Sequence, residues 1–225
     1  MKKSKAVLIV VVVIVVTLVG GGLLLNFQRT DNQVDEEEDP IVDANVPDPA
    51  ANVVVTLEEF CDYQSPACVE ISPTLKKLKE EYGTNLNFVF RNTPLPGNKN
   101  ALPASRAAEA ARMQSRFWEM HYLLLEKQNE WKDDENPRPK LLQWARDLGL
   151  DVTRFEQDMD SEQVTFRIEA DKDAAISLGI QEVPSIAINR RRLKTDAMNS
   201  DGIREGIEVM LTNSSEQSPD VAPSP

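Results

Sequence analysis

The stretch EFCDYQSPAC, residues 59–68, decides how this sequence folds, because it joins two segments of different periodicity. Residues 52–60, which end at the second residue of this stretch, form a short run of apolar and β-branched side chains that is typical of a buried strand. Near its end, Ser65 and Pro66 are residue types favoured at the start of a helix, and a helical apolar face continues to Gly83. The stretch therefore predicts a buried strand that leads directly into a helix.

The rest of the chain extends this unit into an α/β fold. A second strand at residues 86–91 follows the helix at once, which predicts a β-α-β unit with parallel strands and a right-handed crossover. Helical periodicity then predicts a block of helices, and the chain ends with a strand, a turn, a partner strand and an amphipathic helix. The helices are expected at 101–113, 117–125, 141–148, 152–159 and 161–178, the strands at 186–188 and 192–194, and the last helix at 200–211.

The N-terminus predicts a membrane anchor. Three lysines among the first five residues precede an uncharged run at 6–25, about 30 Å long as a helix, which is enough to cross a bilayer. The length of the run favours an uncleaved anchor over a signal peptide, although Gly20–Gly22 keep cleavage open. The lysines predict a cytoplasmic N-terminus, with everything beyond residue 26 outside, in a periplasmic or cell-surface location.

Composition divides the chain into segments and excludes one class of partner. Residues 28–50 are rich in Asp, Glu and Pro and predict a disordered acidic linker after a signal-anchor helix at 1–27. The folded domain is expected at 51–213, with its helical insertion at about 101–180, and a Ser- and Pro-rich disordered tail at 214–225. The net charge of −12 argues against nucleic-acid binding, which needs a basic face.

These residues resemble a known family. Residues 59–68 are similar to the active-site stretch of the DsbA-like family, the branch of the thioredoxin superfamily with a helical insertion. Further matches in the same order are Phe117–His121, Leu148–Asp151 and Val183–Ser185, the last of which resembles the cis-proline loop of that superfamily. The resemblance covers about residues 52–211 and implies a thioredoxin fold, β-α-β, helical insertion, β-β-α, after the transmembrane helix.

The resemblance also implies site residues, with one departure. The family's Cys-x-x-Cys appears here as Ser65-Pro66-Ala67-Cys68. In the family the first cysteine attacks as a thiolate, stabilised by the helix N-terminus. Ser65 occupies that place, where its hydroxyl is expected to cap the helix but cannot form a mixed disulfide. Cys68 matches the second, resolving cysteine, so the candidate catalytic residues are Cys68, Cys61 and Ser65.

Cys61 and the proline loop complete the candidate site. Two cysteines near one active-site rim in an exported protein suggest a Cys61–Cys68 disulfide, but their separation cannot be read from the sequence, so pairing stays open. The resemblance implies that Pro184 is cis and presents the backbone of Val183 to an extended peptide. Pro184, Val183 and Pro66 are the expected substrate-binding residues.

Three functions follow. The first hypothesis is an atypical thiol-disulfide oxidoreductase that acts on exported proteins through Cys68 and Cys61, with an unidentified redox partner in the membrane. The second is a redox-inactive peptide-binding or chaperone-like module. The third is copper delivery through Cys61, Cys68 and His121, although a packing role is expected for His121. No cofactor and no resident metal are expected.

Overall fold

The computed structural model describes residues 55–216. The predicted anchor at 1–27 and the acidic linker at 28–50 lie outside these residues. Within the described residues, no helix is both long and apolar enough to cross a membrane.

A four-stranded sheet in the order β2-β1-β3-β4 forms the centre of the fold. The central strand β1 (Val55–Cys61) pairs in parallel with β2 (Leu86–Asn92) and antiparallel with β3 (Ser185–Ile188). The short strand β4 (Arg191–Arg192) pairs with β3 at the edge. Helix α2 (Pro66–Tyr82) connects the two parallel strands, as the β-α-β prediction requires. The thioredoxin fold predicted from the sequence is confirmed.

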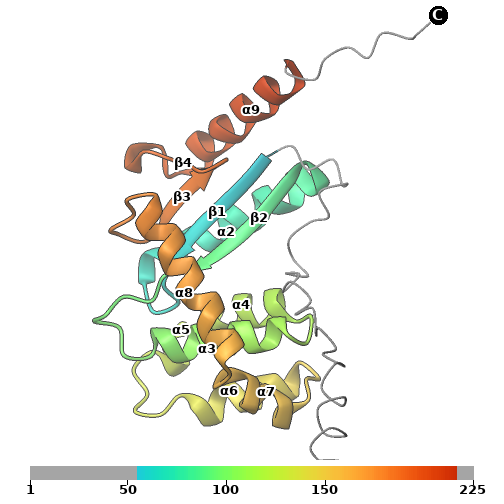
Figure 1. Cartoon of the computed structure of the whole chain (residues 1–225), viewed down its shortest axis with the longest axis vertical. Helices are drawn as coiled ribbons and strands as arrows, with labels where there is room; N and C mark the ends of the chain where they lie inside the picture. Colours follow the sequence, from blue (N-terminus) through green and yellow to red (C-terminus); the bar gives the residue numbers. More distant parts are fainter. Residues whose placement is uncertain (1–54, 217–225) are drawn as a thin grey trace, which may run out of the picture. The chain divides into compact units, whose positions relative to one another are not determined.

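The helices form an insertion at one end of the sheet and two covers over its faces (Figure 1). The insertion confirms the predicted helical block, and the short helix α5 was not predicted. Its side chains Gln128 and Trp131 are nevertheless buried. The last helix continues beyond the expected domain boundary at 213. The bounds are α3 (Ala101–Arg112), α4 (Phe117–Glu126), α5 (Gln128–Trp131), α6 (Arg138–Asp147), α7 (Val152–Met159), α8 (Glu162–Ser177) and α9 (Ser200–Glu216), with 3-10 turns at Gly83–Asn85 and Thr195–Ala197.

Both faces of the sheet are covered, which explains why β1 is apolar on both sides. Leu57 lies on the face covered by α2 and α9, where it packs in one core with Leu75 and Ile203. Phe60 lies on the opposite face and packs against Ala175 of α8. A strand buried on both faces reads as a near-continuous apolar run, the pattern that predicted it.

A buried polar network ties the helical insertion to the sheet. Asn92 at the end of β2 donates to Glu109 of α3 at 2.7 Å and to Asp171 of α8 at 3.0 Å. Arg91 forms ion pairs with Asp171 and with Glu58 of β1. Burial, followed by the nearby charge of Glu109, raises the pKa of Asp171 to about 6. The insertion is therefore held by specific pairs as well as by apolar packing.

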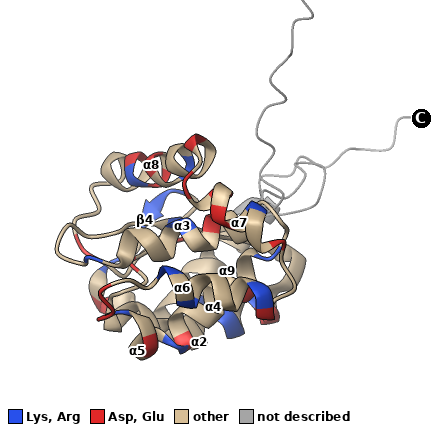
Figure 2. Ribbon diagram, turned by 90° about the horizontal axis from the view of Figure 1, so that it is seen from below, with Lys and Arg blue, Asp and Glu red and all other residues tan. Residues whose placement is uncertain are grey.

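The hairpin between β3 and β4 is basic and exposed (Figure 2). Asn189 and Arg190 have positive φ values of 47° and 62°, as a tight two-residue hairpin turn requires. Arg192 pairs with Glu182 at 3.3 Å. This basic edge contributes no residue to the grooves described below.

Candidate functional site

Cys61 and Cys68 form a disulfide at the point where β1 leads into α2. Cys61 is the last residue of β1, and Cys68 lies in the first turn of α2. Their Cα atoms are 5.9 Å apart, so the pairing that the sequence left open is made. The exposed fractions of the two residues are only 1% and 0%. The bond therefore lies in the core beneath the helix start.

Ser65 lies at the N-cap of α2, but its hydroxyl does not cap the helix. Its side chain makes no capping hydrogen bond, so that prediction was wrong. Pro66 has no amide hydrogen to offer, and the Cys68 amide donates instead to the Ser65 carbonyl oxygen at 3.2 Å. Ser65 is 9% exposed, whereas Pro66 and Ala67 are exposed at the surface. A nearly buried hydroxyl thus lies where the family has a thiol, next to the exposed Pro66 and Ala67.

Asp62 fixes the turn between β1 and α2. Its Oδ1 accepts from the Gln64 amide at 2.7 Å, and its Oδ2 accepts from the Leu95 amide at 2.8 Å and from the Asn98 side chain at 2.7 Å. The side chain is fully buried, and three donors satisfy its carboxylate. Asp62 therefore joins the turn between β1 and α2 to the loop that follows β2.

The helical insertion holds the same turn from the other side. The Gln128 side chain donates to the carbonyl oxygens of Tyr63 at 2.8 Å and Ser65 at 3.2 Å. The Gln64 side chain donates to the Lys132 carbonyl oxygen at 2.9 Å and accepts from the Asn100 amide at 2.9 Å. Sequence reasoning missed these residues, because no local pattern marks partners that lie so far apart in the chain.

Glu59 and His121 are both buried, and burial keeps both side chains neutral near pH 7. Burial raises the pKa of Glu59 to about 8, and its Oε1 has no hydrogen-bond partner. Burial, with Lys79 and Arg112 as lesser causes, lowers the pKa of His121 to about 3. His121 Nδ1 lies 3.0 Å from the hydroxyl of Tyr63 within an aromatic cluster, which agrees with the predicted packing role.

The structure does not assemble the copper site considered from the sequence. The two sulfur atoms are bonded to each other, and His121 is engaged with Tyr63. Across residues 55–216, no group of three His, Cys, Asp or Glu side chains could hold a metal ion.

A groove lies beside the exposed start of α2. The Val183–Pro184 peptide is cis, as the resemblance implied. Pro184, α2 and the segment before α9 enclose about 440 Å³. Of the three expected substrate-binding residues, only Pro184 lines this groove; the other lining residues are Ala67, Glu70, Ile71, Thr74, Met198, Asn199 and Ser200. We name it the proline groove.

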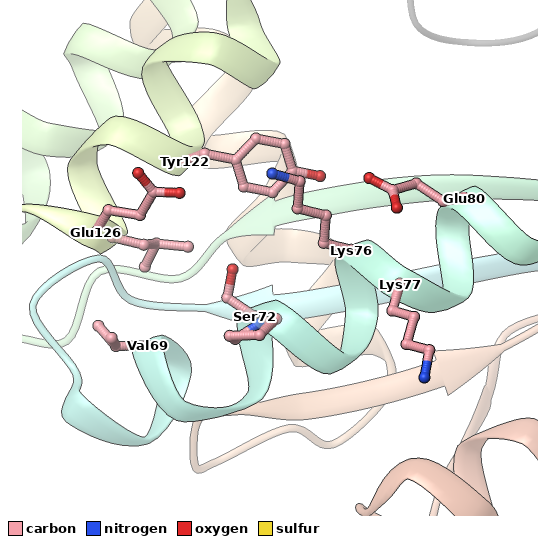
Figure 3. Close-up of a pocket in the computed structure, with 9 residues that line it drawn as sticks. Val69, Ser72, Lys76, Lys77, Glu80, Tyr122 and Glu126 are labelled. Atoms are coloured by element: carbon pink, nitrogen blue, oxygen red, sulfur yellow. The ribbon is translucent and has the colours of Figure 1, made fainter.

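A second groove of about 460 Å³ lies on the other flank of α2, against α4 (Figure 3). Lys76 of α2 lies over the ring of Tyr122, with its Nζ 4.5 Å from the ring centroid. Apolar side chains and charges of both signs surround this groove, namely Val69, Pro73 and Leu125, then Lys76, Lys77, Glu80 and Glu126, with Ser72 and Tyr122. We name it the α4 groove.

The sheet, the cis-proline loop, the helical insertion and the cysteine pair at the start of α2 define a DsbA-like thioredoxin-fold protein. The sequence model of the family described as Thioredoxin matches residues 46–208, and the chain belongs to that family.

The chain is similar to solved structures of thioredoxin-like proteins and to part of the sequences of curated Na⁺/H⁺ antiporters. It is similar to oxidised BdbD from Bacillus subtilis, with 26% identity, a TM-score of 0.63, and coverage of 72% of this chain and 89% of that one. A thioredoxin-like oxidoreductase from Silicibacter pomeroyi is 25% identical, with a TM-score of 0.58 and coverage of 72% and 92%. The Na⁺/H⁺ antiporter NhaA 3 of Salinispora tropica is 36% identical over 139 residues, 61% of this chain. The chain spans only about a fifth of the length of that antiporter.

Proposed function

We propose that this chain is a module that binds extended segments of exported proteins and does not exchange disulfides. The observation that carries the proposal is that the Cys61–Cys68 disulfide is buried and that a serine stands at the helix start where the family has its attacking cysteine. Exchange needs a thiolate to reach a disulfide sulfur, and protein atoms cover both sulfurs. The sequence holds no third cysteine that could attack in their place.

Binding needs only the parts of the site that remain exposed. The proline groove has apolar side chains on three sides, from Ala67 and Ile71 of α2, from Pro184, and from Met198 before α9. Small concave sites of this kind bind apolar side chains, while a few polar groups set the orientation. An extended segment can therefore occupy the groove without forming a covalent bond.

The proposed location is the outer side of a membrane, with the chain anchored by its first 27 residues. The uncharged run at 6–25 and its flanking lysines support this topology. The relatives named as Na⁺/H⁺ antiporters support a membrane setting, since ion exchange takes place across a membrane. The disulfide agrees with an oxidising compartment.

Alkylation of the native and the unfolded protein tests the proposal. The purified full chain is incubated with millimolar glutathione or dithiothreitol, alkylated, and weighed intact. We expect no added label while the protein stays folded, and two labels once it is unfolded in the presence of reductant. Two labels on the folded protein in millimolar glutathione would contradict a purely structural disulfide.

The oxidoreductase hypothesis stays as the second candidate because Cys68, which matches the family's second cysteine, does form a disulfide, with Cys61 as its partner. It requires α2 to open at its first turn so that a client thiolate can reach Cys68. In that case a Cys61→Ala variant should trap a mixed disulfide between Cys68 and a client protein. A binding module should yield no such adduct.

A further inference from the structure

The proline groove carries one charged side chain, and that charge is not compensated. Glu70 lies on the exposed side of α2 at the edge of the groove. Its carboxylate has no ion pair or hydrogen bond with any of residues 55–216. An occupant of the groove therefore meets an unpaired negative charge beside the apolar floor.

The floor accepts apolar side chains of different shapes. Ala67 leaves room next to the helix, and Ile71 and Pro184 supply rigid walls. Met198 is only partly buried, and an unbranched methionine side chain adapts to the shape of its neighbour. The groove thus fits one aliphatic or aromatic side chain without demanding a particular one.

The nearby N-terminus of α9 does not provide a second charge preference in the groove, because it does not form a site for an anion. A helix N-terminus binds anions through free amides. Here the Asn199 side-chain oxygen already accepts from the amides of Asp201 at 3.2 Å and Gly202 at 3.1 Å. Asp201 also adds a negative charge to the first turn of α9. Glu70 is therefore the charge that sets the preference of the groove.

We infer that the proline groove selects extended segments that place a lysine or arginine two residues from an apolar side chain. This selectivity rests on the proposed binding function. Alternate side chains of an extended segment point to the same side. An apolar side chain can then enter the groove while a basic side chain two positions away lies on the same side and reaches Glu70.

Peptides that differ at one position test the inference. Each peptide carries the same apolar residue, with Lys, Gln or Glu placed two residues from it, and its affinity for the purified full chain is measured by fluorescence anisotropy. At low salt we expect the Lys peptide to bind about two- to fivefold more tightly than the Gln peptide, the range of an exposed ion pair, and the Glu peptide to bind most weakly. The difference should vanish at 1 M salt, where the screening length is about 3 Å.

Two matched variants assign the preference to a groove. Glu70→Gln should abolish the discrimination and leave the affinity for the Gln peptide unchanged. Glu126→Gln removes a carboxylate from the α4 groove (Figure 3) and should preserve the discrimination.

Three results would overturn the inference. Equal affinities for the Lys and Gln peptides overturn the charge preference alone and leave the binding function intact. If discrimination survives Glu70→Gln but is lost in Glu126→Gln, the charge preference belongs to the α4 groove and not to the proline groove. Failure of all peptides to bind, the uncharged one included, overturns the proposed function and the inference together.

Discussion

Removing the disulfide should cost stability and leave peptide binding intact. The double variant Cys61→Ala/Cys68→Ala breaks a bridge between residues seven positions apart, which closes an eight-residue loop. Loop-closure entropy then gives a loss of about 2.5 kcal/mol in the free energy of unfolding. Removal of the two buried sulfur atoms also leaves small cavities, which lower the free energy of unfolding further.

The loss can be measured by urea unfolding followed by tryptophan fluorescence, because Trp131 is fully buried and Trp144 nearly so. With a slope of about 2 kcal/mol/M, the midpoint should fall by about 1 M, and the melting temperature by roughly 5–10 °C. Wild-type protein that has been unfolded and reduced before measurement is the control, and its midpoint should fall by a similar amount.

Binding to the proline groove is measured on the same variant. The affinity of the uncharged apolar peptide should stay within about twofold of the wild-type value, since neither sulfur lines the groove. An unchanged urea midpoint would refute the structural role of the disulfide. A folded variant that has lost peptide binding would refute the separation of binding from the cysteine pair.

Three further perturbations test other parts of the structure. Glu59→Gln should flatten the pH dependence of stability, because the folded-state pKa of Glu59, about 8, lies above its ordinary value of 4.5. The contribution of Glu59 to wild-type stability should be constant below pH 4.5 and fall by up to roughly 5 kcal/mol as the pH rises from 4.5 through 8. Urea unfolding at pH 5 and 8.5 would detect this fall in the wild type and its absence in the variant. Ser65→Cys in a Cys61→Ala background should place a second cysteine beside Cys68, so that the two can form a disulfide at the helix start. A reduced peptide should then attack this disulfide and be oxidised at least about tenfold faster than by wild type, because the helix start stabilises the thiolate that leaves; no gain would mean that more than the serine blocks exchange. Gly202→Ala should lower the free energy of unfolding by about 1–3 kcal/mol, because the new Cβ would lie 2.9 Å from the Cα of Ala197 and the backbone there must shift, whereas Gly97→Ala meets no atom within 4 Å and should have little effect.

The fold could be predicted because its signals are local. The apolar run that forms β1, the Ser65-Pro66 start of α2 and the helical periodicity of the insertion each depend on neighbours in the sequence. The short helix α5 was missed because a single turn is too short to show periodicity, although Gln128 and Trp131 bury their side chains there. Local patterns thus fix the order of elements but not every short connection.

The site was only partly predictable because its contacts are not local. The sequence placed both cysteines near one rim, but their pairing depends on how the end of β1 faces the first turn of α2. The capping role expected for Ser65 failed because its carbonyl oxygen, not its hydroxyl, receives the Cys68 amide. The hydrogen bonds of Gln128 to the turn between β1 and α2 join residues more than 60 positions apart, a separation that no sequence pattern reports.

The position of the disulfide separates the two activities that this fold can combine. In the DsbA-like pattern, the cysteine at the exposed helix start gives the disulfide its access to clients, and the second cysteine is shielded. In this chain the partner of Cys68 is Cys61 at the buried end of β1, so a cysteine pair is kept while its access to solvent is lost. The exposed surface next to Ser65 consists of Pro66 and Ala67, and Ala67 also lines the proline groove. Because the groove is built from side chains that do not depend on the sulfur atoms, the proposed peptide binding does not require exchange chemistry. The uncompensated charge of Glu70 then gives such a groove a means of choosing its occupants that requires no covalent step.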